Sequence, residues 1–200
     1  MGRLQRTAAD QITSGIRVAM KNIPTDQVEN VIKMLNSAKE QNKRVMIIGM
    51  GRSGLIGRAF AMRLMHLGFA VYVIGETITP ALEADDILFV ISGSGSTTFV
   101  VDAAEIARKV NAKIIAITSH PESPLGKLAD HIIFIAGRIV TEREKDYFSR
   151  QILGVHEPLA PLGTLFEAST LVFLDSLIVE LMVRLGKTES DMRTRHATVE

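Results

Sequence analysis

The sequence predicts an α/β fold in which a five-stranded parallel sheet carries helices on both faces. Short runs rich in β-branched residues alternate with helical stretches from residue 44 onward, as in consecutive strand–helix–strand units. These runs are apolar throughout, as in 87–91, which reads Ile-Leu-Phe-Val-Ile. Strands without alternation need burial on both faces. The 200 residues suit a single domain over 1–200 with a continuous core.

Two amphipathic helices are expected ahead of the sheet, over residues 3–21 and 25–42. In both segments apolar residues recur every three to four positions. They are Leu4, Ala8, Ile12, Ile16 and Ala19 in the first segment, and Val28, Val31, Ile32, Leu35 and Ala38 in the second. Pro24 precedes the second segment, with Thr25 as its expected N-cap residue. We expect this helical extension, residues 1–42, to pack on the core or on a neighbouring subunit.

The alternating part of the chain follows, and its boundaries come from the change between apolar runs and helical periods. The predicted strands are 44–49, 70–75, 87–91, 113–118 and 131–136, and the predicted helices between them are 53–67 and 96–109. Residues 137–160 carry many charges without a clear period, which indicates a long surface connection. Loops of that length are more often functional than incidental.

The last long element is a helix over residues 162–185, closed by Gly186. Its side chains are apolar nearly all round, and a helix of this kind is normally buried. In a chain of this size the expected cover is another subunit. The remaining residues, 187–200, are polar and charged.

Composition excludes several classes of protein and site. The formal net charge of +1 gives no electrostatic reason to expect nucleic acid or an anionic membrane as the main partner. Without cysteine there is no disulfide, thiolate zinc site or cysteine nucleophile. The histidines form no pair at metal-ligand spacing, so we expect no protein-bound metal. The chain start lacks a signal-peptide core, and no uninterrupted apolar run reaches membrane-spanning length, so a cytoplasmic protein is expected.

Two glycine-serine turns carry the clearest functional signal. Residues 49–54 read Gly-Met-Gly-Arg-Ser-Gly and residues 92–97 read Ser-Gly-Ser-Gly-Ser-Thr, each directly after an apolar run. Each turn opens a predicted helix, where free backbone N–H groups attract anions. Two such turns at the ends of two strands predict a cleft for an anionic ligand, most simply a phosphate.

The first turn also allows a different interpretation. Residues 49–54 match the dinucleotide fingerprint G-x-G-x-x-G, and Glu76 stands about where a ribose-binding acid would. Three observations count against a nicotinamide enzyme. Arg52 and Ser53 suit a free phosphate or sugar, the second turn repeats the design, and no catalytic domain remains. A further alternative is that the glycines only permit a tight turn.

The second turn favours a phosphate monoester. Four hydroxyl residues lie at the expected helix N-terminus, namely Ser92, Ser94, Ser96 and Thr97, and the helix dipole there favours an anion. The turn is not a nucleotide P-loop, because no Gly-Lys-Ser/Thr follows it. Helix capping is the alternative, and it explains one hydroxyl but not four.

Five segments of the chain share a pattern with a known family. They are Gly-Arg-Ser-Gly at 51–54, Ala-Phe-Ala-Met-Arg-Leu-Met-His-Leu-Gly at 59–68, Gly-Glu-Thr at 75–77 with Thr-Pro at 79–80, Ser-Gly-Ser-Gly at 92–95 and Pro-Leu-Gly-Thr-Leu-Phe-Glu at 161–167. Together they resemble the 6-phospho-3-hexuloisomerases, a family within the sugar-isomerase (SIS) domain group. The resemblance implies a flavodoxin-like sheet, a homotetramer with shared active sites, and interconversion of D-arabino-3-hexulose 6-phosphate and D-fructose 6-phosphate without a cofactor.

The resemblance also implies roles for individual residues. The second turn would bind the phosphate of the sugar through Ser92, Ser94 and Thr97. Ser96 stands where many relatives carry glutamate, and its hydroxyl should strengthen the binding of the anion slightly. The first turn would lie near the substrate, through Gly51, Arg52 and Ser53. Glu167 would be the catalytic base. His196, in a tail that departs from the family pattern at Thr198 and Val199, would be a proton donor or ring-opening group.

The chemistry gives Glu167 a clear task. Moving a carbonyl from C3 to C2 requires removal of the C2 proton and return of a proton to C3, and one carboxylate above both carbons can do both. Arg52 is a candidate donor to the enediolate oxygens. However, Thr164-x-x-Glu167 also matches a capping box, in which the carboxylate binds the backbone at the helix start.

Two other functions remain open from the sequence. SIS domains also serve as non-catalytic sugar-phosphate sensors, although no DNA-binding or effector segment is visible here. An isomerase of the same fold could instead act on another sugar phosphate.

Overall fold

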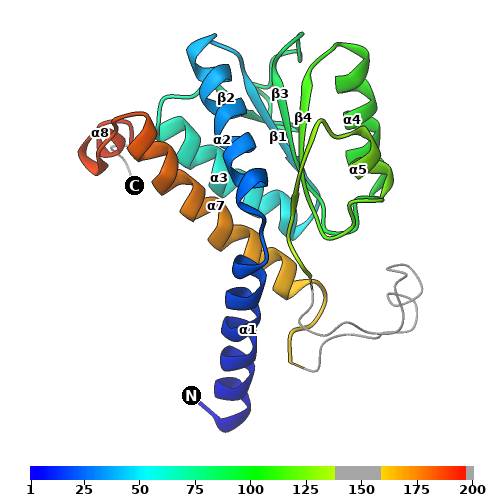
Figure 1. The fold of residues 1–200 in the computed structure, drawn as a ribbon, viewed down its shortest axis with the longest axis vertical. Helices are drawn as coiled ribbons and strands as arrows, with labels where there is room; N and C mark the ends of the chain where they lie inside the picture. Colours follow the sequence, from blue (N-terminus) through cyan, green and yellow to red (C-terminus); the bar gives the residue numbers. More distant parts are fainter. Residues whose placement is uncertain (138–158, 197–200) are drawn as a thin grey trace.

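The computed structural model describes residues 1–137 and 159–196 and confirms the predicted α/β architecture (Figure 1). Its five parallel strands form one sheet in the order β2-β1-β3-β4-β5. The strands are β1 (Val45–Gly49), β2 (Val71–Val73), β3 (Ile87–Ile91), β4 (Lys113–Thr118) and β5 (His131–Phe134). This is the order of the flavodoxin-like, doubly wound folds.

The helices in the described residues include every helix that the periodicity predicts. They are α1 (Arg3–Lys21), α2 (Thr25–Glu40), α3 (Arg52–His66), α4 (Thr98–Lys109), α5 (Pro124–Leu128), α7 (Thr164–Arg184) and α8 (Glu189–Arg193). Helices α5 and α8 were not expected from the sequence. Each has five residues, which is too short for an apolar period to be visible.

The sheet separates two apolar cores, because neighbouring residues of a strand point to opposite faces. On one face Val45 and Ile47 of β1 belong to the core shared with α2, α3 and α7. On the other face Met46 and Ile48 belong to the core shared with α4 and α5. The four side chains are buried, which is why the strand is apolar at every position. Figure 1 shows the two helical layers on either side of the sheet.

The two glycine-serine turns begin side by side at the carboxyl edge of the sheet. The last residues of their strands, Gly49 of β1 and Ile91 of β3, are paired in the sheet register. From there α3 packs on one face and α4 on the other. In doubly wound sheets the crevice between two such diverging connections is where ligands bind. The fold therefore brings both turns to the crevice.

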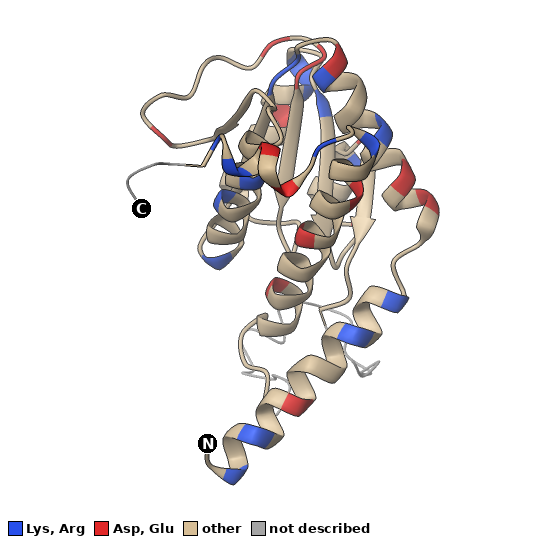
Figure 2. Ribbon diagram, turned by 90° about the vertical axis from the view of Figure 1, so that its left-hand side faces the viewer, with Lys and Arg blue, Asp and Glu red and all other residues tan. Residues whose placement is uncertain are grey.

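The N-terminal helices differ in how much they bury. Helix α2 packs on the core, whereas α1 buries only Gly15 and Ala19 and projects beyond the sheet with its end against α7 (Figures 1 and 2). Leu4 near the start of α1 remains 69% exposed. Helix α7 buries one face, but Val179 and Val183 on it are 61% and 74% exposed. Cover of these faces by a second subunit stays a prediction.

Three further expectations can be compared with the structure. Thr25 is not the N-cap of α2, because Pro24 occupies that position and Thr25 is the first residue of the helix. No side chain caps the start of α2. The expected surface connection, 137–160, lies almost wholly outside the described residues. Among the described helices, none combines the length and apolar character needed to cross a membrane.

Candidate active site at the carboxyl edge of the sheet

The first turn is built by close backbone contact between its outer glycines. A Cβ atom at Gly54 would lie 2.7 Å from the carbonyl oxygen of Gly49, and one at Gly49 would lie 2.9 Å from the nitrogen of Gly54. Gly51 between them has φ of +57°, a conformation that favours glycine. These glycines place Arg52 and Ser53 in the first turn of α3, with the Arg52 side chain 62% exposed.

Arg52 forms an ion pair with Glu167. Its Nε donates to the Glu167 carboxylate, although the two residues are 115 positions apart in the chain. The Glu167 side chain is 13% exposed, so its carboxylate is largely shielded but reaches the surface of the crevice. The structure thus joins the predicted base to the predicted oxyanion donor.

The capping-box interpretation of Glu167 is wrong. The N-cap of α7 is Gly163, with φ of +78°, and Thr164 is already the first helical residue. The Thr164 hydroxyl donates to the carbonyl oxygen of Pro161 at 2.6 Å. Because the helix begins one residue before the capping box requires, the Glu167 side chain is not needed at the helix start and faces Arg52 instead.

The second turn is held together by its own serines. Ser92 is buried, and its hydroxyl accepts a hydrogen bond from the Gly95 N–H at 3.2 Å. The Ser94 hydroxyl accepts from the Ser96 N–H at 3.3 Å. In both cases the hydroxyl acts as the acceptor, so its own proton can be donated elsewhere. An anion with several oxygens is the kind of ligand that could use these donors.

Thr97 lies at the N-cap of α4, but its side chain makes no capping hydrogen bond. The Thr97 hydroxyl therefore does not cap α4, which was the alternative to anion binding. Thr97 and Ser96 are both exposed, at a helix end where unpaired N–H groups and the helix dipole favour an anion.

Helix α7 connects the second turn with Glu167. A Cβ at Gly93 would lie 3.0 Å from the ring of Phe166, which is the residue before Glu167 and is 5% exposed. A side chain at position 93 would displace the Phe166 ring, so glycine suits the close approach of the turn to α7. Through this contact the hydroxyl-rich turn, Glu167 and Arg52 come together at one edge of the sheet.

The segment at the end of β4, residues 118–120, was not predicted to belong to the site. Thr118, Ser119 and His120 all bond to the carbonyl oxygen of Gly93 in the second turn. The signal was present, since three polar residues directly follow an apolar strand at the edge where the two turns lie.

The structure does not bring His196 to this group. Its ring lies against that of His66, with ring centroids 5.2 Å apart and an interplanar angle of 31°. His66 is the last residue of α3 and Arg52 the first. The 15 residues of this helix separate the two ends by roughly 20 Å at 1.5 Å per residue. Within this subunit His196 therefore lies apart from Glu167, and its role, in this subunit's site or a neighbour's, stays a prediction.

The tail that carries His196 is fixed at the far end of α3. Thr188 and Asp191 form a capping box that starts α8, and Met192 of α8 packs on the core. The Arg195 guanidinium lies over Gly68, close to the Lys39 ammonium. Burial, together with the neighbouring charges of Arg195 and Lys187, lowers the pKa of Lys39. Local packing thus explains why the tail does not reach Glu167.

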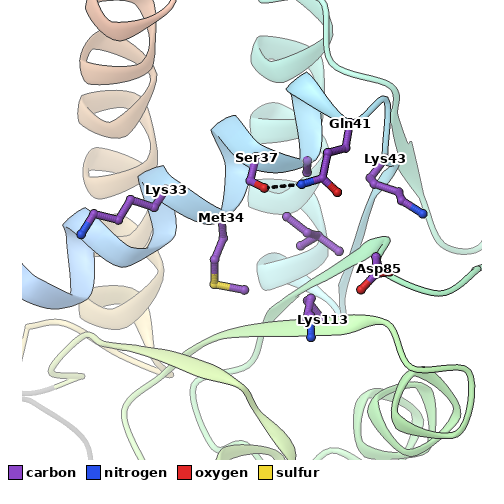
Figure 3. A pocket seen from close by; sticks show the side chains of 9 residues that line it. Lys33, Met34, Ser37, Gln41, Lys43, Asp85 and Lys113 are labelled. Carbon is purple, nitrogen blue, oxygen red and sulfur yellow. Dashed lines mark hydrogen bonds between the residues drawn. The ribbon is translucent and has the colours of Figure 1, made fainter.

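A separate pocket of about 380 Å³ lies at the opposite edge of the sheet (Figure 3). It is lined by Lys33 and Ser37 of α2, Lys43 before β1, Asp85 before β3 and Lys113 at the start of β4, among others. None of the predicted site residues lines this pocket. Because ligands of doubly wound sheets bind at the carboxyl ends of the strands, we place the candidate active site at the other edge.

Comparisons with known proteins show the family to which the chain belongs. The model of the SIS domain family matches residues 40–143. An uncharacterized protein of Aeropyrum pernix is 51% identical, over 91% of this chain and 86% of its own length. The 3-hexulose-6-phosphate isomerase of Methanocaldococcus jannaschii is 38% identical, over 95% of this chain and 96% of its own length.

A solved structure is similar to this chain over almost its whole length. A crystal structure of a Methanococcus jannaschii protein, for which the function of 3-hexulose-6-phosphate isomerase was inferred, is similar with a TM-score of 0.77 and 37% identity. The similarity covers 96% of this chain and 98% of that one. The chain belongs to the SIS domain family and, within it, to the sugar-phosphate isomerases of the 3-hexulose-6-phosphate isomerase group.

Proposed function

We propose that this enzyme interconverts D-arabino-3-hexulose 6-phosphate and D-fructose 6-phosphate. The observation that carries the proposal is the Arg52–Glu167 ion pair beside the hydroxyl-rich turn 92–97. A base, a cation and an anion-binding turn are the three components that proton transfer between adjacent carbons of a ketose phosphate requires. The relatives named 3-hexulose-6-phosphate isomerase support this substrate pair.

In the proposed reaction Glu167 takes the proton from C2 of the 3-hexulose. The electron pair of the broken C2–H bond forms the C2–C3 double bond, and the carbonyl oxygen on C3 becomes an oxyanion to which Arg52 donates. The carboxyl group then returns the proton to C3. The proton of the C2 hydroxyl passes to the oxygen on C3, and C2 becomes the carbonyl carbon. No oxidant, reductant or cofactor is needed to balance this step.

The remaining turn residues hold the substrate. Ser92, Ser94, Ser96 and Thr97 bind the phosphate, while Gly51 and Ser53 lie with Arg52 beside the sugar. A fixed phosphate positions C2 and C3 over one carboxylate, and this kind of orientation accounts for a large part of enzymatic rate enhancement.

A direct assay tests the function. The purified chain is incubated with 3-hexulose 6-phosphate without added cofactor, and formation of fructose 6-phosphate is followed by a coupled enzyme. An aldose phosphate, D-arabinose 5-phosphate, serves as the comparison substrate, and its isomerisation is followed as formation of D-ribulose 5-phosphate. We expect turnover of the hexulose phosphate and little of the pentose phosphate. Binding of the hexulose phosphate without turnover would instead indicate a sugar-phosphate sensor.

The Thr97→Val variant tests the phosphate turn. It removes one hydroxyl from the N-terminus of α4, where that side chain caps nothing, so helix stability should not change. Since a hydrogen bond to a charged group contributes about 1.5–3 kcal/mol, KM should rise about 10- to 100-fold, with kcat little affected. Thr7→Val, which removes an exposed hydroxyl from α1, is the control. Equal KM values for the two variants would argue against a phosphate contact by Thr97.

A further inference from the structure

The carbonyl oxygen of Gly93 accepts more hydrogen bonds than a carbonyl usually does. The Ser119 N–H donates to it at 3.1 Å, the Thr118 hydroxyl at 3.2 Å, and the imidazole of His120 contacts it through Nδ1 at 2.9 Å. A carbonyl oxygen has two lone pairs. Three consecutive residues after β4 therefore converge on a single acceptor in the second turn.

This convergence determines the state of one imidazole nitrogen. A carbonyl oxygen can only accept, so Nδ1 of His120 must carry a proton and act as donor. Thr118 is fully buried, and its hydroxyl also accepts from the His120 N–H at 3.1 Å. The hydrogen bond between His120 and Thr118 thus holds residues 118–120 in a conformation in which their donors face Gly93.

The orientation of the Gly93–Ser94 peptide follows from these bonds. No peptide bond in the described residues is cis, and in a planar trans peptide the N–H points opposite to the C=O. The Gly93 C=O faces the segment at the end of β4, so the Ser94 N–H points away from that segment. Within residues 1–137 and 159–196 this N–H has no hydrogen-bond acceptor.

The same hydrogen bonds also polarise the Gly93–Ser94 peptide. Hydrogen bonds that meet head to tail strengthen one another, because each donor increases the dipole of the group to which it bonds. Three donors on the Gly93 oxygen make the Ser94 N–H at the other end of the same peptide a better donor to an anion. The other end of the turn is fixed independently, since Gly95, with φ of +61°, accepts from the Leu125 N–H at 3.0 Å.

We infer that His120, together with Thr118, is a positioning residue for phosphate binding. It acts through the Gly93–Ser94 peptide, which it orients and polarises so that the Ser94 N–H donates to the phosphate of the substrate. This inference rests on the proposed function, because it concerns the same phosphate site. It adds residues 118–120 to the site through their hydrogen bonds to the Gly93 carbonyl oxygen.

The experiment compares His120→Ala with His120→Asn in the full chain. The side-chain amide nitrogen of asparagine can occupy the position of Nδ1 and donate to the Gly93 oxygen, whereas alanine cannot. Dissociation constants for fructose 6-phosphate and for inorganic phosphate are measured by calorimetry, and KM and kcat by the coupled assay. Thermal unfolding of each variant reports on the fold.

We expect His120→Ala to weaken the binding of both ligands by about 5- to 30-fold, the ratio that corresponds to one or two kcal/mol. KM should rise by a similar factor while kcat changes much less. His120→Asn should restore most of the affinity. Thr118→Val, which removes a second donor to the same oxygen, should weaken phosphate binding in the same direction and serves if His120→Ala does not fold.

Two results would overturn the inference. One is unchanged affinity for fructose 6-phosphate and inorganic phosphate in a folded His120→Ala variant, or in folded Thr118→Val if alanine is not tolerated. The other is equal loss of affinity in His120→Ala and His120→Asn, which would mean that the donor at Nδ1 is not what matters. Failure of the proposed function looks different, since the unaltered chain would then show no isomerisation of the hexulose phosphate.

Discussion

Replacing Glu167 with glutamine is expected to lower kcat for the hexulose phosphate by about 10²–10⁴-fold, the usual contribution of a positioned acid–base group. The amide keeps the size and shape of the side chain but cannot accept the C2 proton. It can still accept a hydrogen bond from Arg52 through its oxygen, so the crevice should keep its arrangement. The affinity for fructose 6-phosphate should change much less than kcat.

The matched control is Glu180→Gln on the same helix. Glu180 also accepts from an arginine, Arg184, at 2.8 Å, but it is 13 positions further along α7 and 47% exposed. Steady-state kinetics on both variants, with calorimetry for product binding, separates catalysis from general effects on α7. If Glu167→Gln kept full activity, the base would have to be another group.

Replacing Asp86 with alanine is expected to lower the free energy of unfolding by about 2–4 kcal/mol. Asp86 is 1% exposed, and its carboxylate accepts from the backbone N–H of Arg44 at 2.8 Å and of Glu83 at 2.9 Å. Alanine leaves both amides without this acceptor, and an unsatisfied buried donor costs about 1–3 kcal/mol. The Arg44 side chain, 3.0 Å from Asp86, also loses a partner.

The Glu83→Ala variant is the control, because it removes a carboxylate that pairs with Arg44 but is not buried. Glu83 pairs with the same arginine at 2.7 Å, but its side chain is 70% exposed, and exposed pairs contribute little to stability. Urea unfolding of both variants should give a lower midpoint for Asp86→Ala and a midpoint close to the unaltered protein for Glu83→Ala. Equal effects would mean that the charge on Arg44, rather than the buried amides, determines the loss.

Most of the fold could be predicted from the sequence, because the signals that define it are local. A parallel strand buried on both faces must be apolar at successive positions, and β1 and β3 meet that requirement. The helices follow from a period of 3.6 residues, which needs several turns to be recognised. This is why α3 and α7 agree with prediction within two residues, whereas α5 and α8, with five residues each, were missed.

The candidate site was predictable only in part. Glycines and hydroxyl residues after a strand indicate an anion-binding turn wherever the chain folds, so the two turns were visible in the sequence. Their side-by-side position depends on strand order, which gives Gly49 and Ile91 as neighbours. The role of His120 depends on a hydrogen bond over 27 positions, for which no local pattern exists.

The sequence by itself determined the alternation of strands and helices, the two glycine-serine turns and the family to which the chain belongs. These rest on residue type and spacing, which act over a few positions and need no knowledge of distant parts of the chain. The tertiary structure decided that Glu167 pairs with Arg52 instead of capping its helix, and that His196 lies at the opposite end of α3 from them. Both outcomes depend on which distant elements pack together, because an ion pair or a ring contact forms only between groups that the whole fold brings within a few ångströms.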